Sequence, residues 1–398
     1  MSDPAARSGS SADTTNSTDT TDTPNSTDTP ADVPPATPRK PRRRVPFWDN
    51  ARFACITLVV MGHAIQRLTA DSDAALVVYL FIYAFHMPAF AIISGFFSKA
   101  SPPGRRQMRR VVTDILLPYL IMESIWSLVQ FLVEGSANLN PTQPSWTLWF
   151  LLALGIFRLV LPYLALLRWP LLWSVAISVG VGFLGNVDST FSLARALGIL
   201  PFFVLGWQLN RWRIIDRWRL VRSRAWWVRV VAAAVLVAWA VVLVVWIDVW
   251  RRMDLQLWFF YDRGYAGLGN ETWTAGLVRL AAILLAVLLT AAFFALLPRR
   301  EGWITRYGQS TMYVYLLHSF MLYPLRESGL LSGTEHPELV LVGMLAASVL
   351  IVVVLSSTPV RTVFRPLVEP RAAWIFSARA YDPVQPHDDP TGARRSER

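Results

Sequence analysis

DNARFACITLVVMGH, residues 49–63, places an acid and an arginine at the mouth of an apolar stretch and a histidine deep inside it. The apolar stretch runs over residues 52–68, and a transmembrane helix needs roughly 20 mostly apolar residues. About nine more windows of this kind follow: 76–98, 111–133, 147–167, 171–187, 193–208, 228–247, 275–297, 311–325 and 339–357. The pattern predicts an all-α, polytopic membrane helix bundle of about ten transmembrane helices.

The composition also indicates a membrane protein. Of the 398 residues, 54% are hydrophobic and only 16% are charged, which is too apolar for a soluble chain of this length. The net charge of +11 lies in short clusters between the apolar windows rather than on one polar face, so nucleic acid is excluded as a partner. The five histidines lack metal-site spacing and no Gly-rich phosphate loop is present, so we expect no metal and no tightly bound cofactor.

The loops predict an orientation, because Lys and Arg mark the cytoplasmic side of a membrane protein. Alternate connections carry basic residues, among them RKPRRR before the first window, RRQMRR after the second and RWRIIDRWRLVRSR after the sixth. The intervening loops TADSD and EGSANLNPTQPS contain no Lys or Arg. Both termini are therefore predicted to be cytoplasmic, with an even number of helices.

Three regions are expected along the chain. Residues 1–45 are rich in Ser, Thr, Asp and Pro and end in a basic cluster, a composition that predicts a disordered cytoplasmic tail. No apolar core precedes the basic cluster, so residues 1–45 lack the pattern of a cleavable signal peptide. Residues 46–366 form the membrane domain, and residues 367–398 form a polar cytoplasmic tail.

Ionisable residues inside the windows are the first candidates for a site, because such groups are costly in lipid and usually face the bundle interior. His63 lies eleven residues above Arg52, or about 16 Å, and His86 lies about 18 Å above the inner end of the second window. The same rise per residue, counted along the windows 111–133 and 147–167, places Glu123 and Arg158 at a similar depth in the membrane. We therefore expect these four groups, His63, His86, Glu123 and Arg158, to meet near the midplane.

Structural explanations compete with the functional one. Glu123 and Arg158 can be a buried ion pair that only fixes helix packing. A lone His63 can be satisfied by a neighbouring carbonyl, but His86 at a matched depth and Gln66 one turn further along the same face favour a site. His318 lies low in the ninth window and is assigned no role.

The residues at the mouth of the first window and the longest outer loop have open interpretations as well. Arg52 sits where arginines extend to the membrane interface, and Asp49 can be a helix N-cap. Residues 248–274 are aromatic and charged, and they can serve as an external lid, an acceptor-binding element or a mere connector.

The combination of motifs resembles a known family. Arg52 and His63 separated by ten residues, Asp49 in a D-x-x-R arrangement, and FHMPAFAIISGFF (85–97) are similar to the acyltransferase-3 family of integral membrane O-acyltransferases, in its fucose 4-O-acetylase-like branch. Further similar blocks are RRVVTDILLPYLI (109–121), SWTLWFLLAL (145–154) and YVYLLHSF (313–320). The resemblance extends over residues 46–365.

The resemblance implies transfer of an acyl group, usually acetyl, from acetyl-CoA or another acyl-CoA to a hydroxyl of a carbohydrate or glycosylated acceptor. The donor would come from the cytoplasm, and the acceptor from the outer side or the membrane. His63 aligns with the histidine considered catalytic and Arg52 with the arginine of the same motif, while His86 is added as catalytic from its depth. We expect a multi-pass protein of a bacterial-type plasma (inner) membrane.

The expected chemistry is direct transfer with His63 as general base, since a neutral imidazole suits that task near pH 7. A covalent route through Cys55 is disfavoured because no histidine is placed to activate it. The phosphates of CoA would bind basic side chains at one membrane face. The donor-binding candidates are Arg52, Arg105, Arg106, Arg109 and Arg110. The supporting candidates are Asp49, Gln66, Glu123, Arg158 and Trp149.

Two other classes of protein remain in competition. A secondary transporter or flippase would use midplane Glu, Arg and His as a relay or substrate site. A membrane sensor without chemistry is the second rival. Consumption of acyl-CoA by the purified protein would separate an enzyme from both.

Overall fold

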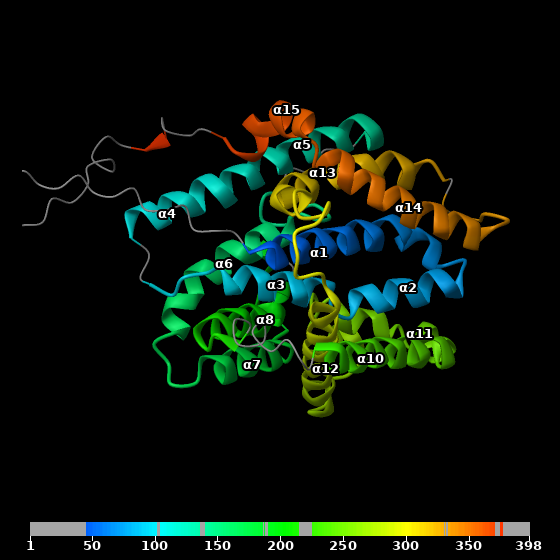
Figure 1. The fold of residues 1–398 in the computed structure, drawn as a ribbon, viewed down its shortest axis with the longest axis horizontal. Helices are drawn as coiled ribbons and strands as arrows, with labels where there is room; N and C mark the ends of the chain where they lie inside the picture. The colour runs from blue at the N-terminus through cyan, green and yellow to red at the C-terminus, as the bar shows by residue number, and fades with distance from the viewer. Residues whose placement is uncertain are drawn as a thin grey trace, which may run out of the picture. The chain divides into compact units, whose positions relative to one another are not determined.

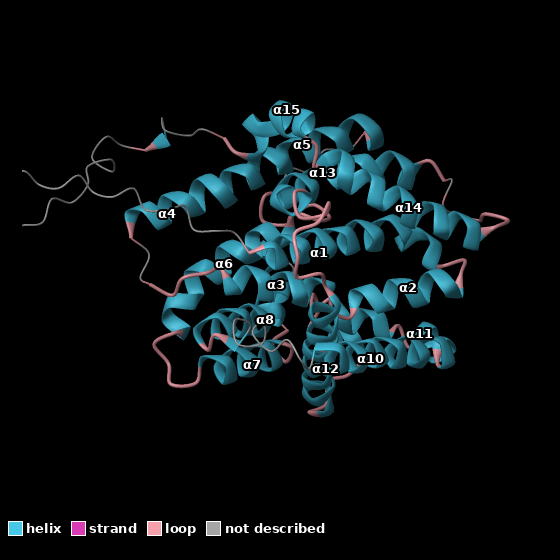
Figure 2. Ribbon diagram, viewed as in Figure 1, coloured by secondary structure: helices cyan, strands magenta, loops and turns pink. Residues whose placement is uncertain are grey.

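The computed structural model of the protein describes residues 45–101, 104–135, 140–185, 187, 190–214, 225–329, 331, 333–370 and 375–376. All regular structure in this part of the chain is helical, and Figure 2 shows helices joined by loops. The predicted all-α class is therefore confirmed for it. The predicted N-terminal tail, apart from residue 45, and most of the predicted C-terminal tail lie outside the described residues.

Each apolar window of the sequence is helical in the structure. The main helices are α1 (Pro46–Ile65), α2 (Asp73–Tyr83), α3 (His86–Phe96), α4 (Arg105–Val111), α5 (Leu117–Glu134), α6 (Trp149–Leu164), α7 (Pro170–Val181), α8 (Leu193–Arg211), α10 (Ala225–Val245), α12 (Thr274–Leu296), α13 (Thr311–Glu327) and α14 (Pro337–Leu355). The shorter helices α11 (Ile247–Arg252) and α15 (Thr358–Val368) follow α10 and α14.

Six stretches in the described part of the chain are long and apolar enough to cross a membrane. They are residues 73–96, 107–134, 190–211, 226–245, 274–296 and 337–355. Helices α6 and α7 are apolar but shorter. The protein is accordingly an integral membrane protein, whereas ten crossings and two cytoplasmic termini stay predictions.

Two long stretches contain local breaks. Helix α2 ends at Tyr83, and α3 begins at His86 after Phe85, whose φ of −145° and ψ of −12° are not helical. Helices α4 and α5 are joined by a π-helical segment, Val112–Leu116, which comes just before Pro118. Such π-turns are often found at functional sites. The first break places His86 at the start of a new helix, near the middle of its apolar stretch.

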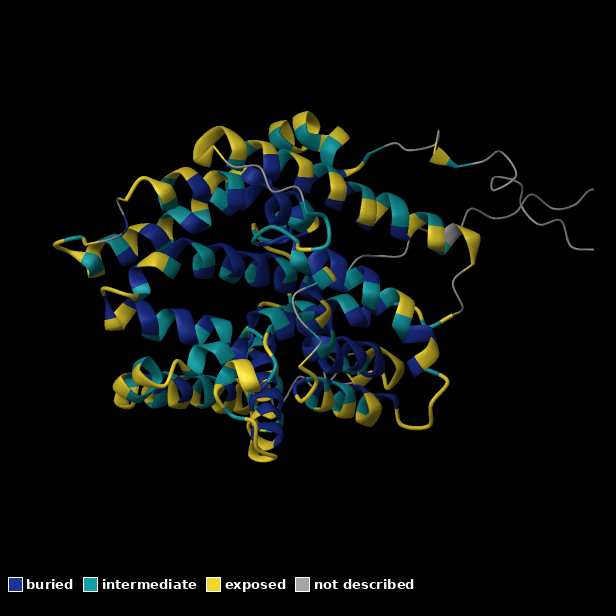
Figure 3. Cartoon of the chain, turned by 180° about the vertical axis from the view of Figure 1, so that it is seen from behind, coloured by how far each residue is buried: buried dark blue, intermediate teal, exposed yellow. Residues whose placement is uncertain are grey.

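Helix α8 lies at the centre of the packing, and its closest neighbour is α3. A Cβ at Gly95 would lie 1.9 Å from the carbonyl oxygen of Phe203, and one at Gly206 would lie 2.0 Å from that of Ile92. Only glycine permits this approach of two backbones. In the most apolar part of each stretch, 67% of the residues are buried for 190–211 but only 17% for 226–245. Helix α8 is therefore central and α10 peripheral (Figure 3).

Helix α1 passes between α3 on one side and α13 and α14 on the other (Figure 1). Its first turn is held by the loop after α12, because the Asn50 side-chain amide donates to the carbonyls of Pro298 and Arg300. The helix begins at Pro46 with Val45 as its N-cap residue. Asp49 is therefore not the N-cap; it lies within the first turn and pairs with Arg52 at 3.1 Å.

We predict that Gly206→Ala destabilises the protein by about 2 kcal/mol or more, because the added methyl meets the Ile92 carbonyl, a backbone group that cannot turn aside. Gly343→Ala is the matched control: this exposed helical glycine of α14 has open space around it, so the change should be neutral or stabilise by up to about 1 kcal/mol. Thermal unfolding in detergent, followed by tryptophan fluorescence, measures both. Equal melting temperatures would contradict the proposed contact.

Candidate functional site

His63 and His86 line one cavity of about 120 Å³, which we call the histidine cavity. The sequence placed these two histidines at one depth, and the structure places them in one space. Gln66 and Trp149, two of the supporting candidates, also line it. The remaining wall residues come from α2, α3, α8 and the loops before α6 and α12: Tyr79, Tyr83, Met87, Trp146, Arg195, Ile199, Phe259, Phe260 and Tyr261.

His63 is surrounded by other rings. Its imidazole centroid lies 5.5 Å from that of His318 and 5.4 Å from that of Trp146. Tyr83 lies 6.4 Å from His63 and 4.7 Å from His86, so it stands between the two cavity histidines. His318 itself is fully buried and does not line the cavity.

The hydrogen bonds of the three histidines differ. His86 Nδ1 lies 2.9 Å from the Ile82 carbonyl, and His318 Nδ1 lies 3.0 Å from the Val314 carbonyl and 2.8 Å from the Tyr315 carbonyl. A carbonyl oxygen can only accept, so in both residues Nδ1 carries the proton and Nε2 is an acceptor. His63 Nδ1 is buried and has no hydrogen-bond partner among the described residues.

Glu123 holds the turn that leads into α6. Its carboxylate accepts bonds from the Ser145 amide at 3.0 Å and the Ser145 hydroxyl at 2.6 Å. The next residue, Trp146, has a φ of +33°, a conformation that is uncommon for a residue with a side chain. From the other side, Tyr315 donates to the Thr147 carbonyl. This clamp fixes the turn from which Trp146 contacts His63.

The loop before α12 closes one side of the histidine cavity. Its Asp262 pairs with Arg195 of α8 at 2.7 Å, and the Arg195 guanidinium lies 5.1 Å from the Trp149 ring. Tyr265 donates its amide to the Gly182 carbonyl at 2.7 Å and its hydroxyl to the Val179 carbonyl at 2.8 Å. The loop is thus more than a connector, because it is fixed to α7 and α8 while Phe259, Phe260 and Tyr261 face the cavity.

Tyr261 is the most constrained residue of this loop. Its φ is +56°, and a Cβ at Gly198 would lie 2.8 Å from the Tyr261 Cβ, so α8 needs a glycine at this point. Burial raises the pKa of the Tyr261 hydroxyl, while the positive charge of Arg279, 4.7 Å from the ring, acts in the opposite direction. Tyr261 therefore faces the cavity as a neutral phenol.

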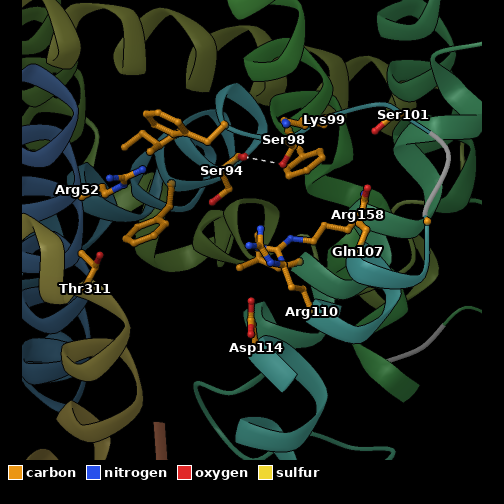
Figure 4. Close-up of a pocket in the computed structure, with 16 residues that line it drawn as sticks. Arg52, Ser94, Ser98, Lys99, Ser101, Gln107, Arg110, Asp114, Arg158 and Thr311 are labelled. Carbon is orange, nitrogen blue, oxygen red and sulfur yellow. Dashed lines mark hydrogen bonds between the residues drawn. The ribbon is translucent and has the colours of Figure 1, made fainter. Parts of the chain in front are cut away.

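A second, larger pocket of about 650 Å³ lies at the other end of α1 and α3, and we call it the basic pocket. Four basic side chains and one acidic side chain line it: Arg52, Lys99, Arg110, Arg158 and Asp114. Figure 4 shows Arg110 and Arg158 close together near the centre of the view, with Arg52 apart from them on the left. The Arg52 guanidinium lies 4.4 Å from the Phe97 ring, and its Asp49 partner is buried. The pocket has the size and charge to hold an anionic small molecule.

An apolar cavity of about 130 Å³ lies between these two spaces. It shares Phe90, Leu154 and Thr311 with the basic pocket and Met87 with the histidine cavity. The three spaces therefore form a series along α1 and α3. One end of the series is basic, the middle is apolar, and the other end contains His63.

The expected meeting of four polar groups near the midplane is wrong for two of them. Glu123 binds the turn before α6, whereas Arg158 lines the basic pocket beside Arg110 and Asp114. The structure shows no ion pair between these two residues. Helix α4, its π-turn and α5 make one long stretch that starts at residue 105. Glu123 therefore lies further along this stretch from its basic end than the window 111–133 predicts.

The remaining candidates are scattered. Arg105 and Arg109 do not line the basic pocket, and the Arg109 guanidinium lies 4.9 Å from the Phe376 ring. The Arg106 side chain lies outside the described part of the chain. Cys55 is fully buried and lines none of the three spaces. No cluster of His, Cys, Asp and Glu among the described residues is placed to hold a metal ion.

The sequence reasoning missed two polar residues beside His63. Arg195 lies inside the sixth apolar window and His318 inside the ninth, and an ionisable residue within such a window is itself a signal. Along its own helix, His318 lies low in the ninth window, which gives no sign that it is near His63. Its position beside α1 follows from how α13 packs, which no sequence window reports.

Comparison with known proteins places the chain among its relatives. The sequence profile of a family described as "Acyltransferase domain" matches residues 45–357. The chain is also 28% identical over 174 residues to the nodulation protein NolL of Mesorhizobium japonicum, a match that covers 40% of this chain and 46% of NolL. The chain thus spans about half the length of this curated relative. No solved structure matches the chain significantly.

We predict that Glu123→Gln loosens the turn before α6. Each carboxylate oxygen of Glu123 accepts one hydrogen bond from Ser145, whereas a Gln side chain has one carbonyl oxygen and an NH2 group that cannot accept. Hydrogen–deuterium exchange of the peptide that covers residues 145–148 should then be faster by about tenfold, a loss of roughly 1.4 kcal/mol. Glu327→Gln, in a half-exposed ion pair with Arg67, is the control and should leave this peptide unchanged. Unaltered exchange in Glu123→Gln would show that the carboxylate does not hold the turn.

Proposed function

Because the chain belongs to the acyltransferase-3 family, whose domain matches residues 45–357, we propose that it is a membrane O-acyltransferase. It takes an acyl group, acetyl in the simplest case, from acyl-CoA and transfers it to a hydroxyl of a carbohydrate or glycoconjugate. The observation that carries this proposal is the series of three spaces, in which the apolar cavity shares wall residues with both the basic pocket and the histidine cavity. The same series gives each part of an acyl-CoA a matching environment.

The basic pocket is the proposed site for the nucleotide end of the donor. The phosphates of CoA would pair with Arg52, Arg110 and Arg158, since guanidinium groups bind phosphate through paired hydrogen bonds. The charge pattern of the loops supports a cytoplasmic location for this pocket, and acyl-CoA is made in the cytoplasm. We propose a bacterial-type plasma membrane as the location of the protein on the same grounds.

The apolar cavity is the proposed passage for the pantetheine arm and the acyl group. Arg52 and His63 are eleven residues apart on α1, which corresponds to about 16 Å along the helix. An extended arm of this length can leave its phosphates at Arg52 and carry the thioester to His63. The donor is a substrate that leaves after each turnover, so no tightly bound cofactor is required.

His63 is the proposed general base. Its Nε2 takes the proton of the acceptor hydroxyl while the hydroxyl oxygen attacks the thioester carbonyl carbon. The tetrahedral intermediate collapses with cleavage of the carbon–sulfur bond, and the proton on His63 passes to the leaving sulfur. The products are the acyl ester and free CoA thiol. His86, whose Nε2 is an acceptor, would orient a second group of the acceptor substrate.

The walls of the histidine cavity support a sugar as the acceptor. Tyr83, Trp146, Trp149 and Phe260 offer ring faces against which the apolar face of a sugar can pack, and Gln66 has a buried carbonyl oxygen without a partner among the described residues. A space of about 120 Å³ holds only the reacting unit of an acceptor.

We predict that His63→Ala lowers kcat by about 10² to 10⁴-fold, because a general base contributes that much to proton transfer. Release of CoA thiol from acetyl-CoA by the purified protein, with a panel of sugar acceptors, measures this. His336→Ala is the matched control, since His336 is an exposed histidine before α14, and it should keep full activity. A fully active and folded His63→Ala protein would remove His63 from the reaction. Failure of the wild type even to bind acetyl-CoA would favour a transporter instead.

For the basic pocket, we predict that Arg110→Ala and Arg158→Ala each raise the KM for acetyl-CoA by about 10- to 100-fold and leave kcat nearly unchanged. The loss corresponds to one charge-assisted hydrogen bond, about 1.5–3 kcal/mol. An exposed arginine far from the pocket, Arg252 of α11, supplies the control variant Arg252→Ala. A fall in kcat at constant KM would contradict a donor-binding role.

A further inference from the structure

His318 is a buried histidine that lines none of the three spaces described above, yet it lies beside the proposed base. The His63 and His318 ring centroids are 5.5 Å apart, and the ring planes differ by 37°. His318 has no exposed surface and is absent from the wall of the histidine cavity. It therefore cannot contact a substrate directly, and any effect on the reaction must pass through His63.

Each ring has one buried nitrogen without a hydrogen bond in the described part of the chain: Nδ1 of His63 and Nε2 of His318. Two carbonyls, of Val314 and Tyr315, fix the His318 proton on Nδ1, so its Nε2 presents a lone pair. A buried donor or acceptor left unpaired costs about 1–3 kcal/mol. These two atoms can satisfy each other, because an Nδ1–H of His63 is the donor that the His318 lone pair lacks.

The geometry allows this bond after a small adjustment. A centroid separation of 5.5 Å leaves room for one hydrogen bond between facing ring nitrogens. The χ2 torsion of histidine is soft, so the His63 ring, whose Nδ1 has no partner among the described residues, can turn toward His318 at little cost. Catalytic hydrogen bonds are commonly longer before the substrate is bound. His86 cannot take this role in the same way, because its own ring lines the cavity and contacts Tyr83.

We propose that His318 is the positioning residue of the site: it accepts a hydrogen bond from His63 Nδ1–H and so leaves His63 Nε2 unprotonated and directed to the acceptor hydroxyl. When His63 takes up the acceptor proton, the same bond stabilises the imidazolium ion. This inference rests on the proposed function for the role of His63 as base. It adds a histidine–histidine pair in place of the carboxylate–histidine pair that orients many catalytic bases.

The test combines two variants of His318 with a measurement that needs no substrate. His318→Phe keeps a ring but removes the acceptor, whereas His318→Gln can place a carbonyl oxygen near the position of Nε2. We expect His318→Phe to lower kcat by about 100-fold or more with little change in the KM for acetyl-CoA, and His318→Gln to restore part of the loss. A purely structural role would instead lower the melting temperature of both variants.

The second measurement is the ring ¹⁵N spectrum of the full-length protein in lipid, labelled with ¹⁵N-histidine and assigned by difference from His63→Ala. We expect His63 to be protonated at Nδ1 in the wild type and to shift toward the Nε2–H form in His318→Phe. The proposal would be overturned by a wild-type His63 that is protonated at Nε2. It would also be overturned if His63 kept the same tautomer in His318→Phe as in the wild type. An inactive wild type with the expected tautomer shift would refute the proposed function and leave the pairing of the two rings intact.

Discussion

The site depends on α1, because this helix sets the distance between Arg52 and His63 and is packed against α3, α13 and α14. A helix rises about 1.5 Å per residue, so Arg52 and His63 are kept about 16 Å apart along the axis. The loop after α12 holds the first turn through Asn50, and α3, α13 and α14 pack along the rest. The basic pocket and the histidine cavity are placed relative to each other by this one helix.

The packing of α3 on α8 supplies the second wall. Gly95 and Gly206 let the two backbones touch, which leaves no freedom for α3 to slide along α8. Because α3 begins at His86, that contact also fixes the second histidine of the cavity. Small residues at such crossings are the usual means of close helix packing in membranes, where neighbouring lipid removes most of the hydrophobic drive between helices.

Polar groups in the interior are arranged so that most of them act on backbone rather than on each other. Glu123 binds the amide of Ser145, and Asn50 binds two carbonyls. His86 binds the Ile82 carbonyl at the end of α2, and His318 binds carbonyls of its own helix. A backbone or side-chain polar group left unpaired in an apolar interior is costly. Nδ1 of His63 is one of several buried polar atoms without a partner in the described part of the chain, and it belongs to the residue for which the family resemblance implies chemistry.

The sequence by itself determined the helical class, the position of every apolar window and the pair of histidines, because these follow from composition and from a fixed rise per residue. It also carried the family motif, since Arg52 and His63 are local to one helix. It did not determine the separation of Glu123 from Arg158, the approach of His318 and Arg195 to His63, or the closing of the cavity by residues 259–261. These contacts are between helices far apart in the chain. They follow from how α5, α8 and α13 pack, which no single stretch of sequence reports.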